Sequence, residues 1–190
     1  MASLWFEFGT MSSSKTMRLL TVNHNYIENG MKTLLLTSAL DNRNGVGVIS
    51  SRAGLTSEAI AVSEKDNLFA LFSNVEDDID AVLVDESQFL TRTQVLELSR
   101  IVDNYNIPVM CYGLKTDFQG ILFKGSEALL EIADKLEEVK TLCRFCDKKA
   151  IMNMRVDENG KKMLEGEKVQ IGGNESYMPV CRKHFFNPIN

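Results

Sequence analysis

The residues from Gly9 to Thr16, Gly-Thr-Met-Ser-Ser-Ser-Lys-Thr, constrain the fold of this 190-residue chain more than any other stretch. They follow an alternating apolar run at 4–8 and precede a segment with helical apolar spacing that begins at Met17. A strand, a loop of small residues, Lys-Thr and a helix form the arrangement of a phosphate-binding P-loop. In such a loop, successive backbone N–H groups and the positive end of the helix surround a phosphate. We expect Lys15 to reach the β and γ phosphates and the Thr16 hydroxyl to hold Mg²⁺.

One position departs from the usual pattern. P-loops normally carry Gly immediately before the Lys, and this chain has Ser14 there. Glycine permits a positive φ and a close approach of the backbone to a ligand. Ser14 is therefore expected to weaken phosphate binding or to strain the loop. The alternative interpretation of the whole stretch is a Ser-rich turn that binds no ligand.

Composition and charge limit the remaining possibilities. A hydrophobic content of 44% and a charged content of 25% are ordinary for a globular protein. The apolar run near the N-terminus lacks the basic leader of a signal peptide, and no run is long enough to span a bilayer, so we expect a cytoplasmic protein. A net charge of -5 argues against nucleic acid or an anionic membrane as the main partner.

Apolar runs alternate with helical patterns along most of the chain. We expect strands at 4–8, 32–37, 59–62, 81–84, 107–112 and 139–142, and helices from 17 to about 29 and at 67–72, 91–105 and 126–138. This order predicts an α/β fold of the P-loop (RecA-like) type, with a parallel sheet flanked by helices. Residues 41–57 are polar and Gly-rich and are expected to form a flexible loop, either near a site or as a solvated connector.

An acidic pair follows the apolar strand that begins at Ala81. Asp85 and Glu86 stand at its carboxyl end, where open α/β sheets bind ligands. In P-loop proteins an Asp at this position helps to hold Mg²⁺, and Glu86 beside it is a candidate general base. The alternative is an ordinary acidic turn after a strand.

Four residues near the C-terminus have the spacing of a zinc knuckle. They are Cys143 and Cys146, then Cys181 and His184, and a closed Cys₃His set of this kind is structural. Redox Cys-x-x-Cys chemistry is one alternative, but it leaves the second pair unexplained, and the other alternative is a set of unrelated surface residues. Cys111 lies in an expected strand and is predicted to be an inert buried thiol.

The sequence therefore predicts two domains, a P-loop domain at 1–142 and a small zinc-ribbon domain at 143–190. The ribbon is expected to have strands at 149–156 and 167–171, joined through a turn at 157–160. Residues 172–177 are expected to be flexible. They are either part of a plain ribbon loop or a lasso-like lid over a substrate.

Taken in order, these motifs resemble the zinc-containing, cellular-type thymidine kinases over nearly the whole chain. The matching pieces are Gly9-Thr10-Met11 through Lys15-Thr16, Asp41-Asn42-Arg43, Asp85-Glu86-Ser87-Gln88-Phe89, Gly113 to Phe118, and Ile171-Gly172-Gly173 with Tyr177 before Val180-Cys181. The resemblance implies transfer of the γ-phosphate of ATP to the 5′-hydroxyl of thymidine, giving thymidine monophosphate for DNA synthesis.

The resemblance also implies roles for individual residues. Glu86 is expected to be the general base, and Asp85 to hold Mg²⁺ through water. Arg43, positioned by Asp41, is expected to act on the phosphates together with Lys15. The complete set implied to contact ATP and Mg²⁺ is Gly9, Thr10, Met11, Ser12, Ser13, Ser14, Lys15, Thr16, Asp41, Arg43, Asp85, Glu86, Ser87 and Gln88.

The implied thymidine pocket is lined by Met11, Phe89, Leu114, Phe118, Phe123 and Tyr177, with backbone groups near Ile171 and Gly172 holding the base. Each aromatic side chain taken alone could equally be part of the core. The resemblance further implies a homotetramer, feedback inhibition by thymidine triphosphate and a structural Zn²⁺. Two rival hypotheses are a nucleotide sensor with little turnover because of Ser14, and a zinc-ribbon nucleic-acid binder with ATPase activity, which the acidic charge disfavours.

Overall fold

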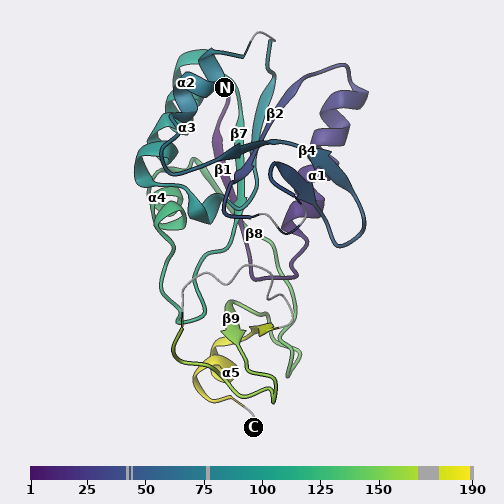
Figure 1. Ribbon diagram of the computed structural model, residues 1–190, viewed down its shortest axis with the longest axis vertical. Coiled ribbons are helices and arrows are strands. Elements are labelled where there is room, and N and C mark those ends of the chain that lie inside the picture. The colour runs from purple at the N-terminus through teal and green to yellow at the C-terminus, as the bar shows by residue number, and fades with distance from the viewer. Residues whose placement is uncertain (42, 44, 76–77, 167–175, 189–190) are drawn as a thin grey trace.

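A computed structural model describes residues 1–41, 43, 45–75, 78–166 and 176–188 (Figure 1). Its centre is a six-stranded sheet in the order β5-β2-β6-β7-β1-β8, in which every neighbouring pair is parallel. The strands are β1 (Leu4–Phe8), β2 (Thr33–Ser38), β5 (Ile60–Val62), β6 (Ala81–Val84), β7 (Val109–Gly113) and β8 (Lys135–Glu138). The predicted parallel α/β fold is confirmed.

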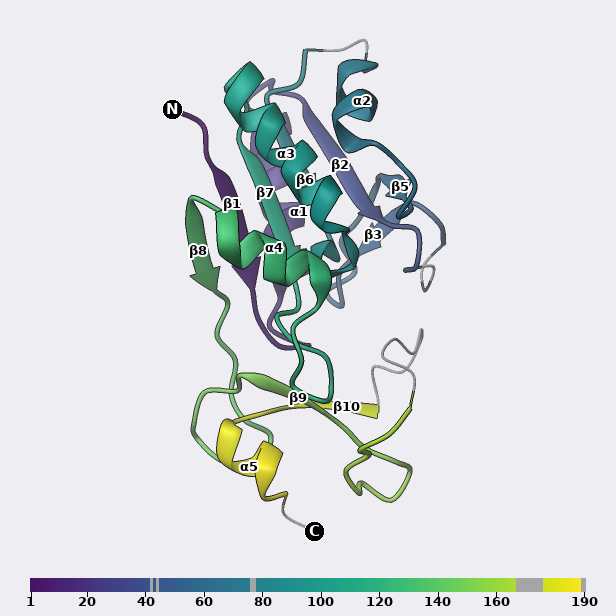
Figure 2. The same ribbon diagram turned by 90° about the vertical axis from the view of Figure 1, so that its left-hand side faces the viewer.

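Helices cover both faces of this sheet (Figures 1 and 2). They are α1 (Lys15–Glu28), α2 (Leu68–Ser73), α3 (Arg92–Tyr105), α4 (Lys124–Ile132) and the short helix η1 (Ser87–Phe89). One face carries α2, α3 and α4, and the other carries α1. The predicted helices at 17–29, 67–72 and 91–105 are confirmed to within a residue or two.

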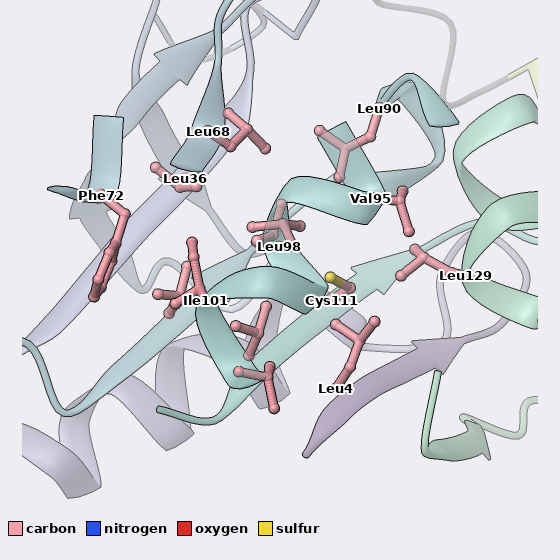
Figure 3. Close-up of a cluster of buried hydrophobic side chains, with 14 of the residues drawn as sticks. Leu4, Leu36, Leu68, Phe72, Leu90, Val95, Leu98, Ile101, Cys111 and Leu129 are labelled. Atoms are coloured by element: carbon pink, nitrogen blue, oxygen red, sulfur yellow. The ribbon is translucent and has the colours of Figure 1, made fainter. Parts of the chain in front are cut away.

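The central strands are apolar throughout because both of their faces are buried. In β6, Val82 and Val84 join the cluster under α2, α3 and α4, whereas Leu83 faces α1. Figure 3 shows the larger cluster, in which Leu98 and Ile101 of α3 pack on the sheet. Cys111 belongs to this cluster and has no exposed surface, which confirms the prediction of a buried thiol.

The helix predicted at 126–138 is wrong in its second half, and so is the strand predicted at 139–142. Helix α4 ends at Ile132, and Lys135–Glu138 forms the edge strand β8 beside β1. The chain leaves the helix because Asp134 accepts a 2.7 Å hydrogen bond from the Leu4 N–H and the backbone that follows pairs with β1. The helical periodicity of 126–138 is a local pattern, so it cannot predict that these residues pair with a strand more than a hundred residues earlier.

The loop predicted at 41–57 is wrong over its second half. Strands β3 (Val48–Ser50) and β4 (Thr56–Glu58) form an antiparallel hairpin there, and residues 42 and 44 lie outside the described chain. Ile49 is 2% exposed and packs with residues of α1 and the central sheet. Burial of this one side chain ties the hairpin to the α1 face.

A smaller lobe follows the sheet (Figure 2). It contains β9 (Met152–Arg155), β10 (Tyr177–Val180) and helix α5 (Arg182–Phe186), with its own apolar cluster around Met154 and Val180. The partner of β9 is β10, so Tyr177 begins a strand and the prediction of a flexible segment is wrong at that residue. The strand predicted at 167–171 lies outside the described residues. The predicted turn at 157–160 is confirmed by a hydrogen bond from the Gly160 N–H to Asp157 O.

Within the described ranges, no helix combines the length and apolar character needed to cross a bilayer.

Candidate functional site

The loop between β1 and α1 has an unusual backbone. Ser12 and Ser14 both lie in the left-handed region, with φ values of 63° and 64°. Ser14 immediately precedes α1, and its side chain makes no capping hydrogen bond. An L-residue in this region costs about 1–2 kcal/mol, and Gly avoids that cost. The position before Lys15 therefore has the conformation for which P-loops use glycine.

Lys15 folds back over its own loop. Its Nζ donates to Gly9 O at 3.3 Å, Thr10 O at 2.8 Å and Ser13 Oγ at 3.2 Å. Burial lowers the pKa of Lys15 to about 8, although the nearby charges of Glu86 and Asp85 act to raise it. The ammonium group is therefore held between the loop and the acidic pair.

The start of the loop tolerates no side chain. A Cβ at Gly9 would lie 2.6 Å from both Ser13 Oγ and Val139 O. This close approach explains the first glycine of the motif on steric grounds alone.

Asp85 follows β6, and it is buried at the carboxyl end of the sheet, being only 6% exposed. Burial and the charge of Glu86 raise its pKa to about 7, while hydrogen bonds from the Glu86 N–H and from the Thr16 side chain act in the opposite direction. Thr16 and Asp85 thus bring a hydroxyl and a carboxylate together. Oxygen donors of this type suit Mg²⁺.

Both carboxylate oxygens of Glu86 are held by side chains. Oε1 accepts a hydrogen bond from Arg43 Nη2 at 3.0 Å, and Oε2 accepts one from Gln88 Nε2. The Glu86 backbone is left-handed at φ 51°, and its N–H donates to Asp85 Oδ1 at 3.0 Å. Non-glycine residues in this conformation are uncommon and concentrate at functional sites.

Arg43 is anchored on its other side by Asp41. Its Nε donates to Asp41 Oδ1 and its Nη2 to Asp41 Oδ2, each at 2.7 Å. The structure therefore brings Asp41, Arg43 and Glu86 into one chain of charge-assisted contacts. Arg43 faces carboxylates in this arrangement, although its predicted partners are phosphates.

Gln88 and Ser87 lie beneath the site. Gln88 is 1% exposed, and its Oε1 accepts the Leu114 N–H at 3.0 Å while its Nε2 donates to Glu86. Ser87 has no exposed surface, and its hydroxyl donates to Tyr112 O at 3.0 Å. In this arrangement both side chains connect η1 to β7, and their predicted nucleotide contacts stay predictions.

Four of the aromatic residues predicted to line a nucleoside pocket make ring contacts in two separate groups. Phe89 and Phe123 form an edge-to-face pair with centroids 5.7 Å apart. Phe118 and Tyr177 both flank the guanidinium of Arg155, at 5.4 Å and 5.8 Å from their ring centroids. The Leu114 N–H donates to Gln88 Oε1, next to Phe89 in the chain. Ile171 and Gly172 lie outside the described residues.

The smaller lobe contributes a direct contact to the P-loop. Asn153 of β9 is 3% exposed, and its Oδ1 accepts the Met11 N–H at 2.8 Å. Sequence reasoning missed Asn153 and Arg155. The Met11–Asn153 contact joins residues 142 positions apart, so it leaves no local pattern in the sequence. Polar residues in an expected ribbon strand are also typical of a face exposed to solvent.

The four predicted zinc ligands converge. The ligand atoms of Cys143, Cys146, Cys181 and His184 all lie within 4.8 Å of one another. His184 Nδ1 is 3.3 Å from Cys143 Sγ and 3.5 Å from Cys181 Sγ. Burial acts to raise the pKa of Cys143, but backbone N–H groups and His184 outweigh it and lower the pKa to about 6. A Cys₃His cluster of this shape is compatible with zinc.

Comparison with known proteins gives one family. The family model described as "Thymidine kinase" matches residues 2–185. The thymidine kinase of Streptococcus pyogenes serotype M3 is 52% identical over 188 residues, which cover 99% of both chains. The thymidine kinase of Streptococcus agalactiae serotype Ia is 50% identical over the same share of both chains. The similarity therefore includes the sheet, the loop at 9–16 and the Cys/His cluster.

Proposed function

This chain belongs to the thymidine kinase family, and on that premise we propose that it transfers the γ-phosphate of ATP to the 5′-hydroxyl of thymidine. One observation supports this activity above the others. Lys15 of the P-loop and the acidic pair Asp85-Glu86 lie close enough for their charges to act on one another at the carboxyl edge of the sheet. We infer that this site combines a phosphate-binding cation with a proton acceptor.

Phosphoryl transfer needs positioning and charge stabilisation more than covalent chemistry. The backbone N–H groups at the end of the P-loop, where α1 begins, and the Lys15 ammonium bind the phosphates of ATP. Thr16 and Asp85 are the residues that would hold Mg²⁺, which supplies neutralisation of phosphate charge when it is bound. Lys15 Nζ lies at the loop and donates there to two backbone oxygens and one hydroxyl. Phosphate oxygens of ATP can take the place of these acceptors.

Glu86 accepts the proton of the 5′-hydroxyl. Arg43 and Gln88 hold one carboxylate oxygen each, so the group cannot rotate freely between substrate and solvent. Asp41 extends this support by fixing Arg43. We assign Gln88 a positioning role rather than direct contact with nucleotide, because both ends of its buried amide are engaged.

The aromatic residues of the pocket suit a pyrimidine nucleoside, which needs a mostly apolar cage with a few polar contacts. Phe89, Phe118, Phe123 and Tyr177 supply the rings, Met11 and Leu114 supply aliphatic walls, and backbone groups near Ile171 and Gly172 hold the base. The segment before β10 then serves as the lid over the nucleoside.

The remaining proposals concern the state of the protein. The Cys₃His cluster holds a structural Zn²⁺ that organises a C-terminal domain at 143–190, distinct from the P-loop domain at 1–142. The protein is a cytoplasmic homotetramer inhibited by thymidine triphosphate, and neither nucleic acid nor membrane is a partner.

The test is transfer of radiolabelled phosphate from ATP to thymidine, measured beside ATP hydrolysis with and without DNA. Labelled thymidine monophosphate, formed only with Mg²⁺, is the expected result. Hydrolysis of ATP without labelling of thymidine would overturn the proposal. Binding of ATP with neither reaction would identify a nucleotide sensor.

A further inference from the structure

We propose that Arg52, at the tip of the β3–β4 hairpin, is a second cation for the phosphates of the bound nucleotide. The inference rests on the proposed function, because it assigns a contact within the same ATP site. None of the sequence motifs includes this residue, which lies in the polar, Gly-rich stretch expected to be a loop near a site or a solvated connector.

The first observation is the position of its side chain. Arg52 Nη1 donates a 2.8 Å hydrogen bond to Ser12 Oγ, across 40 positions of sequence. Ser12 stands in the middle of the P-loop, between Gly9 and Lys15. The guanidinium therefore approaches the loop from the hairpin side, and the Lys15 ammonium approaches it from the start of α1.

The second observation is that the hairpin tip is built as a defined turn. The Ser51 N–H donates to Leu55 O at 2.8 Å, and the Gly54 N–H donates to Ser51 O at 3.0 Å. Gly54 has a φ of 85°, which favours glycine at this corner. Ser51 is 8% exposed, and Ile49 anchors the hairpin below it. The turn therefore presents Arg52 to the P-loop from a packed base.

The third observation is the distribution of charge. The predicted phosphate ligand Arg43 is engaged by the carboxylates of Asp41 and Glu86. By contrast, Arg52 pairs with no carboxylate within the part of the chain that the structure describes. Its charge acts on Lys15 in the direction of lowering the lysine pKa, so the two cations repel each other across the loop.

Two neighbouring cations on a loop that leads into the N-terminus of α1 form a site that an anion stabilises. Guanidinium matches phosphate particularly well, because its planar fork can donate two parallel hydrogen bonds. In P-loop enzymes an arginine supplied from outside the loop stabilises charge on the transferred phosphoryl group. Arg52 is placed to do this within the same chain, leaving Arg43 to orient Glu86.

The test compares wild type, Arg52→Gln, Arg52→Lys and the matched control Arg100→Gln. Arg100 lies on α3 over the ring of Phe69, on the other face of the sheet, so its loss is expected to leave the ATP site unchanged. Binding of ATP, ADP and AMP is measured by calorimetry without thymidine, and KM for ATP and for thymidine by phosphate transfer. Melting temperatures establish that each variant is folded.

We expect Arg52→Gln to weaken ATP binding by roughly 10- to 100-fold, the range for a hydrogen bond to a charged group. The loss is expected to shrink from ATP to AMP, with KM for thymidine unchanged, and Arg52→Lys to be intermediate. Equal binding of ATP by Arg52→Gln and wild type, or an equal loss for ATP and AMP, would overturn the inference. If the wild type binds ATP but does not phosphorylate thymidine, the proposed function is wrong. The inference about Arg52 is still tested in that case, because the binding measurements need no thymidine.

Discussion

The guanidinium of Arg43 donates to Oε1 of Glu86 at 3.0 Å, joining the segment after β2 to the segment after β6. Because the two strands are parallel neighbours, their carboxyl ends meet at the same edge of the sheet. The contact fixes the orientation of the Glu86 carboxylate, which would otherwise rotate freely at the surface. Its orientation is part of the proposed chemistry, and it suggests the first two predictions.

Replacing Glu86 with Gln retains the shape of the side chain and removes its ability to accept a proton. General-base catalysis typically contributes about 10²- to 10⁴-fold, so we expect kcat to fall within that range while thymidine binding is nearly kept. Steady-state phosphate transfer and equilibrium binding of thymidine measure the two quantities. An unchanged kcat would show that the base lies elsewhere.

Replacing Gln88 with Leu leaves the Leu114 N–H and one Glu86 oxygen without their partner. Misplacement of a catalytic group by about 1 Å can cost up to roughly 100-fold, so we expect kcat to fall by about 10- to 100-fold with a smaller change in KM for thymidine. Gln119→Leu is the control, because the exposed Gln119 amide donates to Leu164 O of the smaller lobe rather than to Glu86, and its kcat should match that of wild type. A loss confined to stability, with kcat retained, would contradict the positioning role.

Replacing Ser14 with Gly removes a side chain from a residue with a φ of 64°. Relief of part of a strain of about 1–3 kcal/mol at such a position predicts that kcat/KM for ATP rises by roughly three- to thirtyfold while thymidine affinity stays the same. Asn106→Gly is the control, because Asn106 has the same left-handed backbone, with a φ of 53°, at the end of α3. It should leave kcat/KM unchanged. A weaker use of ATP by Ser14→Gly would mean that the Ser14 hydroxyl is itself a phosphate contact.

Protein purified without added zinc is expected to contain one zinc per chain, bound by the Cys₃His cluster. Cys181→Ser should lose the metal and destabilise the fold. A loss of about 4 kcal/mol corresponds to a fall of roughly 8–16 °C in Tm for a chain of this size. Cys111→Ser removes a buried thiol outside the cluster and should keep its zinc. Metal analysis and thermal unfolding provide the readouts, and a folded, active, zinc-free wild type would rule the site out.

The errors in the sequence-based fold occur at the edges of the structure. The apolar core strands and the α3 helix with its Thr91 capping box were predictable, because their patterns are local and strong. Edge strand β8 and the β3–β4 hairpin were not, since exposed or half-exposed strands lack a continuous apolar run. Their pairing depends on a partner that already has its place in the fold.

The sequence by itself determined the P-loop, the acidic pair at the end of β6 and the Cys₃His cluster, because each depends on residue types at short, fixed spacing. Only the tertiary structure decided which groups meet around them. Arg43 faces Glu86, Arg52 reaches Ser12, and Asn153 accepts from the Met11 N–H. These contacts join residues between 40 and 142 positions apart, so no local pattern encodes them. They arise because parallel strands gather their carboxyl ends at one edge, where the hairpin and the smaller lobe also converge.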